Sequence, residues 1–385
     1  MSDKEEYRIN SCTAQRTGNP GRVVLAVPSL CAGGAERIIS EMANWWAVHE
    51  REVAVLTLNS TCADHYPLHP GVQRIRFDWS IPRTRVHIPV QYVRQQIMIR
   101  RAVLDYNPGV VISFIDRTNI RMLLALAGSG IPVIVSERID PRYHDIGCYW
   151  SFVRRMLYPF SQALVVQTDP VAAWAYRVIS LSRVRVIPNF VREMHVQGIM
   201  PEEREPVILA VGRLDKQKGH DLLIRAFARA DAKQKGWRLV ILGEGPERSN
   251  LWRLTEDLGI HDAVSMPGVV KEPAEWMYKA DLFVLPSRYE GFPNALLEAM
   301  ACGCAVIAAD CPSGPAEIIR HGVNGLLVPR ENITALSTAM DRLMQDEELR
   351  VNLGKQAIEI SSRFSQAKIM AQWDDLIEDV CISPK

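Results

Sequence analysis

The chain alternates short apolar runs with longer segments of helical periodicity over nearly its whole length. Runs of a few apolar residues, bounded by glycine, proline or polar residues, are typical of buried parallel strands. They predict strands at 23–28, 53–58, 110–114, 133–136, 163–167 and 184–187, and again at 207–211, 238–242, 264–269, 282–285, 305–308 and 326–328. Strands that alternate with helices fold into doubly wound parallel sheets. The predicted fold class is therefore α/β.

The length of the chain predicts two domains. Its 385 residues exceed what one hydrophobic core usually supports, so two cores of about 150–200 residues each are expected. Ile187-Pro188-Asn189-Phe190 closes the first half, and Met200 to Glu205 has the proline and glutamate content of a linker. We therefore expect one domain over residues 1–195 and a second over residues 200–365.

Charge is distributed unevenly between the two halves. The formal net charge of the whole chain is +1, but residues 1–195 carry a net +7 and the remainder −6, counting Lys and Arg against Asp and Glu. The basic half suggests contact with an anionic partner. The eight cysteines are scattered, which favours reduced thiols and no metal over a disulfide framework. We expect neither a signal peptide nor a membrane-spanning segment.

The stretch from Pro286 to Ala299 predicts a site for an anion. It reads P-S-R-Y-E-G-F-P-N-A-L-L-E-A and follows a predicted strand. A helix from Asn294 to Ala301 would begin just after Pro293, which suits a first helical turn. The backbone amides of Asn294, Ala295 and Leu296 would then open at the end of a strand, where the helix dipole favours an anion.

Two carboxylates, Glu290 and Glu298, flank this anion site. Carboxylates accept hydrogen bonds from sugar and ribose hydroxyls, so the combination suits a sugar nucleotide. The alternative is an ordinary strand-to-helix turn with two solvated glutamates.

Two further loops add candidates for phosphate binding. Arg213 and Lys218 lie between Gly212 and Gly219, just after a predicted strand, and could deliver two cations to one diphosphate. The pair Gly33-Gly34 lies between a strand and a helix, where backbone can approach a phosphate. Alternatively, neither loop binds phosphate: the first is an ordinary polar loop, and the glycine pair only permits a tight turn.

These motifs resemble those of a known enzyme family. The segments G-R-L-D-K-Q-K-G, L-G-E-G-P and E-G-F-P-N-A-L-L-E are similar to the retaining GT-B glycosyltransferases of family 4, and the resemblance extends from Gly33 to the final helix. The segments S-E-R, V-V-Q-T and I-P-N resemble a subgroup that extends lipid-linked glycans and exopolysaccharides, whose members transfer GalNAc, galactose or glucose.

The resemblance implies a fold and a set of residue roles. The fold would be GT-B, two Rossmann-like domains facing a cleft, with the C-terminal helix 366–385 returning to the first domain. Arg213 and Lys218 would bind the diphosphate of a UDP-sugar, Glu290 the donor sugar and Glu298 the ribose. Further donor contacts would come from Gly33, Gly34, Gly243, Glu244, Val269, Gly291, Phe292, Asn294, Ala295 and Leu296. No cofactor and no metal would be required, with the UDP-sugar as co-substrate.

One position departs from the family pattern. Many relatives carry a histidine after the strand that reads V-V-I-S-F here, but this chain has Ile115 and Asp116. Asp116 would hydrogen-bond the donor sugar in its place or only cap the turn, so no enzymatic nucleophile is assigned. The polar residues Asn119, Glu137 and Arg138 also follow predicted strands, where such sheets bind ligands. We expect these three to bind the acceptor.

The segment from Trp79 to Leu104 has arginines and apolar residues but no acidic residue. This pattern suits a helix on an anionic membrane surface, although a core-packed helix with a solvated basic face would look similar. The arginines concerned are Arg83, Arg85, Arg94, Arg100 and Arg101. We expect a peripheral enzyme on the inner face of a bacterial cytoplasmic membrane, with a polyprenyl-diphosphate glycan as acceptor and no nucleic-acid partner.

Two other functions remain open on the sequence alone. The enzyme could use a soluble acceptor, such as a small sugar or metabolite, and the basic segment argues against that. The chain could also be an inactive sugar-nucleotide-binding partner of a transferase, and the complete set of Arg213, Lys218, Glu290 and Glu298 argues against that.

Overall fold

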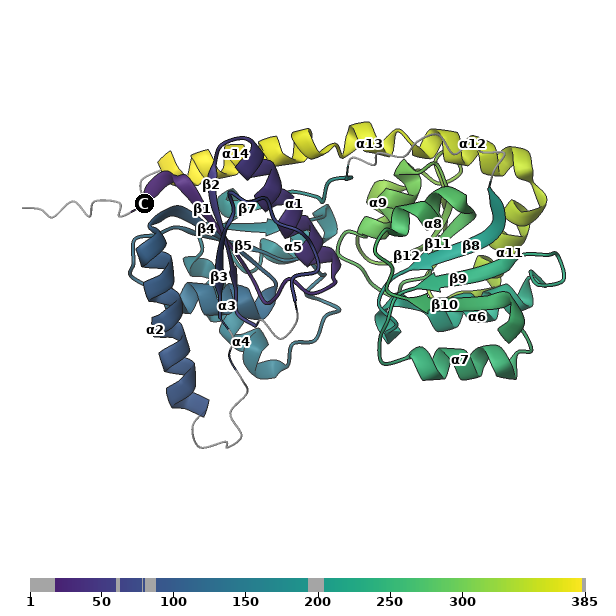
Figure 1. Ribbon diagram of the computed structural model, residues 1–385, viewed down its shortest axis with the longest axis horizontal. Coiled ribbons are helices and arrows are strands. Elements are labelled where there is room, and N and C mark those ends of the chain that lie inside the picture. Colours follow the sequence, from purple (N-terminus) through teal and green to yellow (C-terminus); the bar gives the residue numbers. More distant parts are fainter. Residues whose placement is uncertain (1–17, 60–62, 78, 80–87, 193–203, 383–385) are drawn as a thin grey trace, which may run out of the picture. The chain divides into compact units, whose positions relative to one another are not determined.

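The computed structural model describes the chain except residues 1–17, 60–62, 78, 80–87, 193–203 and 383–385. The described strands form two sheets, one of seven strands and one of six (Figure 1). The α/β class predicted from the alternation of apolar runs is therefore confirmed.

The seven-stranded sheet has the order β3-β2-β1-β4-β5-β6-β7. Strand β1 pairs in parallel with β2 and β4, and β6 pairs in parallel with β7. The strands are β1 (Asn19–Val27), β2 (Glu52–Thr57), β3 (Gln73–Arg76), β4 (Pro108–Phe114), β5 (Val133–Ser136), β6 (Ala163–Val166) and β7 (Val184–Val186).

The six-stranded sheet has the order β10-β9-β8-β11-β12-β13. Its strands are β8 (Glu205–Val211), β9 (Arg238–Leu242), β10 (Val264–Gly268), β11 (Ala280–Leu285), β12 (Ala305–Asp310) and β13 (Leu326–Pro329). All of its neighbouring strands pair in parallel. The chain order reverses between β8 and β11, and such a reversal is where open α/β sheets bind ligands.

The α-helices lie between these strands and after the last one. In the first half they are α1 (Gly34–Val48), α2 (Ile88–Tyr106), α3 (Asp116–Ala125), α4 (Cys148–Leu157) and α5 (Asp169–Ala175). In the second half they are α6 (His220–Arg229), α7 (Arg248–Asp257), α8 (Pro273–Lys279), α9 (Asn294–Ala301), α10 (Pro315–Ile318), α11 (Ile333–Gln345), α12 (Glu347–Ala357), α13 (Ile360–Arg363) and α14 (Gln366–Ile382).

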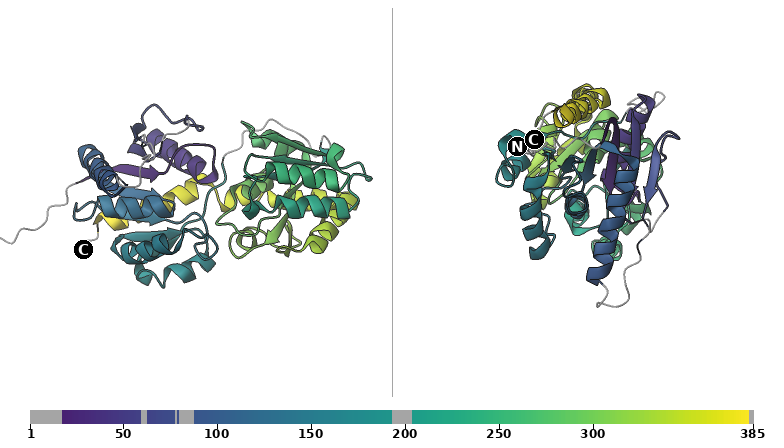
Figure 2. Two further views of the ribbon diagram at one scale, coloured as in Figure 1. Left: turned by 90° about the horizontal axis from the view of Figure 1, so that it is seen from below. Right: turned by 90° about the vertical axis from the view of Figure 1, so that its left-hand side faces the viewer.

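Helices cover both faces of the six-stranded sheet (Figures 1 and 2). Helix α6 packs with α7 and α11 on one face, while α8 and α9 contact each other and the strands on the other. The sequence of α6 accounts for its packing, because Leu223, Ile224 and Phe227 recur at helical spacing and are fully buried. They form one continuous core with the strand residues Ile208 and Leu239.

The chain forms two compact units. One comprises Met1–Val135, Met156–Gln162 and Asp379–Lys385, and the other comprises Ser136–Arg155 and Ala163–Glu378. The second unit contains the whole six-stranded sheet. The domain bounds expected from the sequence stay a prediction.

Two features of the described chain were not expected. The strand β3 reads Q-R-I-R, which lacks an apolar run, so no strand was predicted there. Cys31 takes part in a disulfide bond, which the scattered cysteines did not predict. Cys148, Cys302, Cys304, Cys311 and Cys381 form no disulfide bond. Among the described helices, none is long and apolar enough to cross a membrane.

Candidate active site

Two loops meet at the carboxyl ends of neighbouring strands in the second unit. The first runs from Gly212 to Gly219 after β8, and the second from Pro286 to Pro293 after β11. Because β8 and β11 pair in parallel, both loops leave the sheet at the same edge. They lie at the point where the strand order reverses, which is the expected ligand position in such a sheet.

The first loop is shaped by its own polar contacts. Residues Lys216–Lys218 form a 3₁₀ turn, and the Asp215 carboxylate caps it by accepting a hydrogen bond from the Lys218 amide at 3.2 Å. Gly219 then adopts a left-handed conformation with φ of 67°, and a Cβ there would collide with the Pro286 carbonyl. Glycine is therefore needed for both its backbone angle and the close approach of the second loop.

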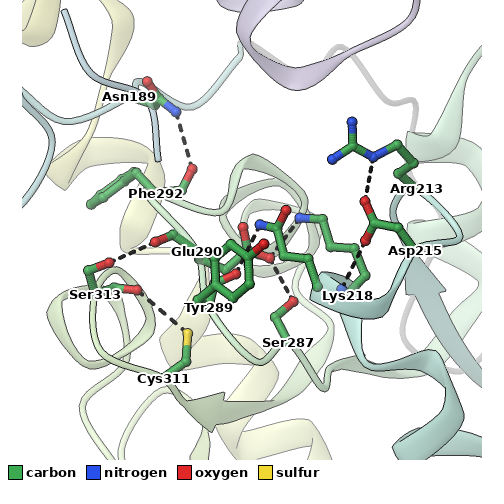
Figure 3. Close-up of polar contacts among 11 residues, drawn as sticks. Asn189, Arg213, Asp215, Lys218, Ser287, Tyr289, Glu290, Phe292, Cys311 and Ser313 are labelled. Carbon is green, nitrogen blue, oxygen red and sulfur yellow. Dashed lines mark hydrogen bonds and ion pairs between the residues drawn. The ribbon is translucent and has the colours of Figure 1, made fainter. Parts of the chain in front are cut away.

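Lys218 and Glu290 form the central ion pair of the site (Figure 3). The Lys218 Nζ lies 2.7 Å from the Glu290 Oε1, and the Ser287 hydroxyl donates to the same oxygen at 2.6 Å. The Glu290 side chain is 6% exposed and the Lys218 side chain 21%. The pair is thus largely dry, with the lysine as its solvent-facing member.

Arg213 supplies a second cation on the same loop. Its Nε lies 2.5 Å from the Asp215 Oδ2, and its side chain is 65% exposed. In Figure 3 the terminal nitrogens of its guanidinium point away from Asp215. Asp215 therefore orients both predicted phosphate ligands, by its side-chain bond to Arg213 and by its cap on the turn that carries Lys218.

Arg288 fastens the second loop to the first. Its guanidinium donates to the Lys216 carbonyl at 2.7 Å and binds both oxygens of Asp221 at 2.9 and 2.8 Å. The Gln217 side chain donates to the Tyr289 carbonyl at 3.0 Å. These bonds fix the spacing between the loop that carries Lys218 and the turn that carries Glu290.

The turn around Gly291 is held from its other side. A Cβ at Gly291 would collide with the Arg138 carbonyl, so glycine is required by close backbone contact. The Asn189 amide donates to the Phe292 carbonyl at 3.2 Å and to the Asn294 Oδ1 at 2.5 Å. The Ser313 hydroxyl donates to the Glu290 carbonyl at 2.7 Å. Both faces of the turn are thereby fixed.

Helix α9 starts at Asn294 and ends at Ala301, as the sequence predicted. The Leu296 amide donates to the Pro293 carbonyl at 3.1 Å, which corrects the expectation that its amide is open to an anion. Ala295 follows Asn294 in the first turn. Glu298 lies one helical turn further along α9 and is buried.

The predicted donor contacts Gly243, Glu244 and Val269 lie just after the ends of β9 and β10. A Cβ at Gly243 would collide with the Gly212 carbonyl, so this glycine lets the turn after β9 approach the first loop. The Glu244 carboxylate accepts from Arg248 at 2.7 Å. Val269 is exposed and follows the neighbouring strand β10.

In the first unit, acidic side chains lie at two predicted site positions. Gly33 precedes α1, which begins at Gly34. A Cβ at Gly33 would collide with the Glu36 carboxylate, so an acid lies beside Gly33. Asp116 begins α3 and accepts from the Arg117 amide at 2.5 Å. The preceding Ile115 has φ of 72°, which is strained for a β-branched residue and marks a constrained turn.

The three predicted acceptor residues are largely engaged by the protein. Asn119 is fully buried and donates to the Tyr158 hydroxyl at 3.0 Å. Glu137 is buried 3.7 Å from Arg154. Arg138 donates to the Asn189 Oδ1 at 2.8 Å, and burial lowers the pKa of its guanidinium to about 9. Their role in acceptor binding stays a prediction.

Burial also keeps a histidine beside the ion pair neutral. His220 follows Gly219 at the start of α6 and is 2% exposed. Burial, and to a smaller extent the Lys218 charge, lowers the pKa of its imidazole to about 4. The positive charge of this loop therefore comes from its lysines and Arg213.

Several contributing residues escaped the sequence analysis. Ser287, Asp215, Arg288 and Asn189 orient the predicted ligands, but no local sequence pattern marks them. Arg288 and Asn189 act on partners that are remote in sequence, and Asp215 caps a backbone amide. Among the described residues, no group of three or more His, Cys, Asp or Glu side chains could hold a metal ion.

Comparison with known proteins places this geometry in a family. Residues 192–360, which contain both loops and α9, match the glycosyl transferases group 1. Residues 192–360 of this chain are therefore a glycosyl transferases group 1 region. The predicted family and the GT-B fold are therefore confirmed, and the chain is a glycosyltransferase at this level of description.

Relatives of this glycosyltransferase include two bacterial proteins. A GalNAc-α-(1→4)-GalNAc-α-(1→3)-diNAcBac-PP-undecaprenol α-1,4-N-acetyl-D-galactosaminyltransferase of Campylobacter jejuni is 28% identical over 366 residues, covering 93% of this chain and 99% of that protein. An exopolysaccharide phosphotransferase of Streptomyces coelicolor is 40% identical over 227 residues, covering 58% of this chain but only 24% of that protein.

Among solved structures, the glycosyltransferase resembles Anabaena HepE in complex with UDP and glucose. The TM-score is 0.78 with 17% sequence identity, over 93% of this chain and 99% of that one. At this identity the likeness concerns the fold.

Proposed function

We propose that this glycosyltransferase is retaining and metal-independent, and that it moves a hexose or N-acetylhexosamine from a UDP-sugar to a polyprenyl-diphosphate-linked glycan. The observation that carries the proposal is the Lys218–Glu290 ion pair at 2.7 Å, next to the exposed Arg213. The pair lies at the strand reversal of a sheet whose fold resembles that of a UDP complex.

The proposed reaction places the donor diphosphate against Lys218 and Arg213. When the bond between the anomeric carbon and the diphosphate breaks, the electron pair goes to the diphosphate oxygen, and these two fixed cations stabilise the developing charge. Glu290, held by Lys218 and Ser287, accepts from a hydroxyl of the donor sugar, and Glu298 accepts from the ribose. The protein's own cations take the place of a metal ion.

Retention follows from attack on the face that the leaving group occupies. The acceptor hydroxyl oxygen bonds to the anomeric carbon on that face, and its proton passes to the departing phosphate oxygen. UDP is released, and atoms and charge balance without an enzymatic nucleophile. Asp116 contributes a hydrogen bond to the donor sugar in this scheme.

The acceptor class is supported by the relatives. The Campylobacter relative, which this chain matches over nearly its full length, is named for an undecaprenyl-diphosphate glycan. A lipid-linked acceptor stays in its bilayer, so the enzyme works at the cytoplasmic membrane surface. Of the five arginines predicted to face that surface, Arg83 and Arg85 lie outside the described residues, while Arg94 and Arg101 are exposed on α2.

A panel of labelled UDP-sugars tests this function. Each would be incubated with the purified protein and either a lipid-linked glycan or a soluble sugar, and the product would be analysed for anomeric configuration. We expect transfer from one UDP-sugar to the lipid-linked glycan with retained configuration. Transfer only to the soluble sugar would replace the acceptor class, and UDP-sugar binding without any transfer would identify an inactive binding partner instead.

A further inference from the structure

Helix α4 presents an apolar side to solvent. Tyr149, Phe152 and Met156 follow the i, i+3, i+7 spacing that places side chains on one face of a helix, and Phe160 comes directly after the helix in a 3₁₀ turn. Their exposed fractions lie between 57% and 74%. We call these four residues the α4 apolar face.

The inward side of α4 holds the half-buried Trp150, Val153 and Leu157 together with one charged residue. Arg154 is the one residue of this fully described helix that is buried. Its guanidinium lies 3.7 Å from the Glu137 carboxylate and over the ring of Trp174, 5.1 Å from the ring centre. A helix on a water-facing protein surface normally buries its apolar stripe and exposes its charges. Helix α4 instead carries a second, exposed set of apolar side chains on the side opposite Arg154.

The chemistry of the α4 apolar face fits a lipid surface better than a protein. The chain has no acidic residue from Ile146 to Thr168, and Arg155 is exposed beside Phe152 and Met156. Aromatic residues next to arginine are typical of the membrane–water interface. A stable protein interface buries roughly 800 Å² on each partner, which is large for one side of a short helix.

We propose that the α4 apolar face inserts into the interfacial layer of an anionic membrane. The Arg154–Glu137 pair holds the helix on the protein, Arg155 contacts lipid headgroups, and the four apolar side chains enter the boundary between headgroups and acyl chains. The purpose of this contact, which is to bring the enzyme to a lipid-linked acceptor, rests on the proposed function. The lipid contact itself follows from α4.

Insertion of apolar side chains has a salt dependence that separates it from arginine binding. Contacts between exposed arginines and lipid headgroups weaken at high ionic strength, whereas burial of aromatic side chains persists. We therefore expect vesicle binding that remains in part at 1 M NaCl, and we expect the α4 apolar face to account for the remaining part.

The test is flotation of the full-length protein with phosphatidylcholine–phosphatidylglycerol vesicles. The double variant Phe152→Ser/Phe160→Ser should bind at least tenfold more weakly at 1 M NaCl, while Leu181→Ser, a matched exposed apolar residue outside α4, should bind like wild type. Circular dichroism would verify that both variants fold. Unchanged flotation of the double variant, or no flotation of wild type, would overturn the proposal.

Two further readouts separate this proposal from the proposed function. Transfer to a short-chain, water-soluble acceptor analogue should be unaffected in the double variant. Flotation that depends on α4, in a protein that transfers no sugar, would support the lipid contact and contradict the proposed function. A concentration-dependent dimer in light scattering that the double variant abolishes, without flotation of wild type, would assign the face to a second copy and overturn the proposal.

Discussion

The Lys218–Glu290 pair is asymmetric in exposure. Glu290 is buried under Ser287 and Lys218, while Lys218 keeps a part of its side chain in contact with solvent. A lysine in this position can contact a second anion while it keeps its bond to Glu290, since its ammonium group has three donors. A diphosphate can therefore bind without first breaking the pair.

Removal of the lysine ammonium should affect turnover far more than folding. We predict that Lys218→Ala lowers kcat by about 10²–10³-fold, the usual cost of one lost contact to developing charge. Lys216→Ala is the matched control, because Lys216 lies in the same turn and is exposed. Steady-state kinetics of both variants would check this, and a kcat within about threefold of wild type in Lys218→Ala would place the diphosphate elsewhere.

His220 gives the site a pH-dependent stability. Its folded-state pKa is lowered to about 4 from an ordinary value of 6.5, so the unfolded chain binds a proton that the folded chain rejects. The full stabilising effect is present above pH 6.5. The free energy of unfolding then decreases by up to about 3 kcal/mol as pH falls toward 4. Urea unfolding between pH 7 and 4 should show this slope in wild type and in His261→Gln, and a shallower slope in His220→Gln.

Residue type and spacing predicted Lys218, Glu290 and the start of α9 at Asn294, because these features are local or belong to a recognisable motif. The partners that orient them were not predicted. Ser287 is near Glu290 in sequence but has no distinguishing pattern. Asn189 acts from more than 100 residues away on a carbonyl oxygen, which leaves no trace in local composition.

At the scale of elements, the two loops of the site act as one unit through Arg288. We predict that Arg288→Met lowers kcat about tenfold with a smaller change in donor KM, because Lys218 and Glu290 lose their fixed spacing. The lost charge-assisted bonds to Asp221 should also lower stability by about 1–3 kcal/mol. Arg225→Met, at an exposed position on α6, is the control, and equal kinetics of the two variants would remove Arg288 from this role.

The arginines of α2 differ from one another in their surroundings. Arg100 donates to the Ala125 and Ala127 carbonyls near the end of α3, at 3.1 and 2.7 Å, so its replacement would disturb that helix end. Arg94 and Arg101 are exposed. We predict that Arg94→Glu/Arg101→Glu weakens binding to anionic vesicles at least tenfold at low salt, since each arginine near such a surface is worth about 1 kcal/mol. Equal vesicle sedimentation of this variant and wild type would exclude α2.

Helices and strands were predictable where the apolar pattern was long. Which face of a helix meets the protein core was not predictable. The strand β3 was missed because Q-R-I-R has no apolar run. The spacing of Tyr149, Phe152 and Met156 defines a face of α4, but a pattern cannot tell whether that face meets the protein core or its surroundings. The contacts of Arg154 with Glu137 and Trp174 decide that question.

At the scale of the whole molecule, the second unit brings both loops, α9 and their supporting contacts to one sheet edge. The matched family region, residues 192–360, includes all of these elements. The relatives are named for lipid-linked glycans and exopolysaccharide, and the basic charge of the first half is consistent with work at an anionic surface. Transfer of a sugar without a metal ion is the central claim.

The most direct test is sugar transfer to a lipid-linked glycan in the presence of EDTA. Wild-type protein would be treated with EDTA, supplied with a labelled UDP-sugar and the acceptor, and assayed for lipid-extractable label beside Lys218→Ala. The proposed mechanism predicts full wild-type transfer in EDTA and at least a hundredfold less in the variant. Loss of wild-type transfer in EDTA, with recovery on addition of magnesium or manganese, would contradict it.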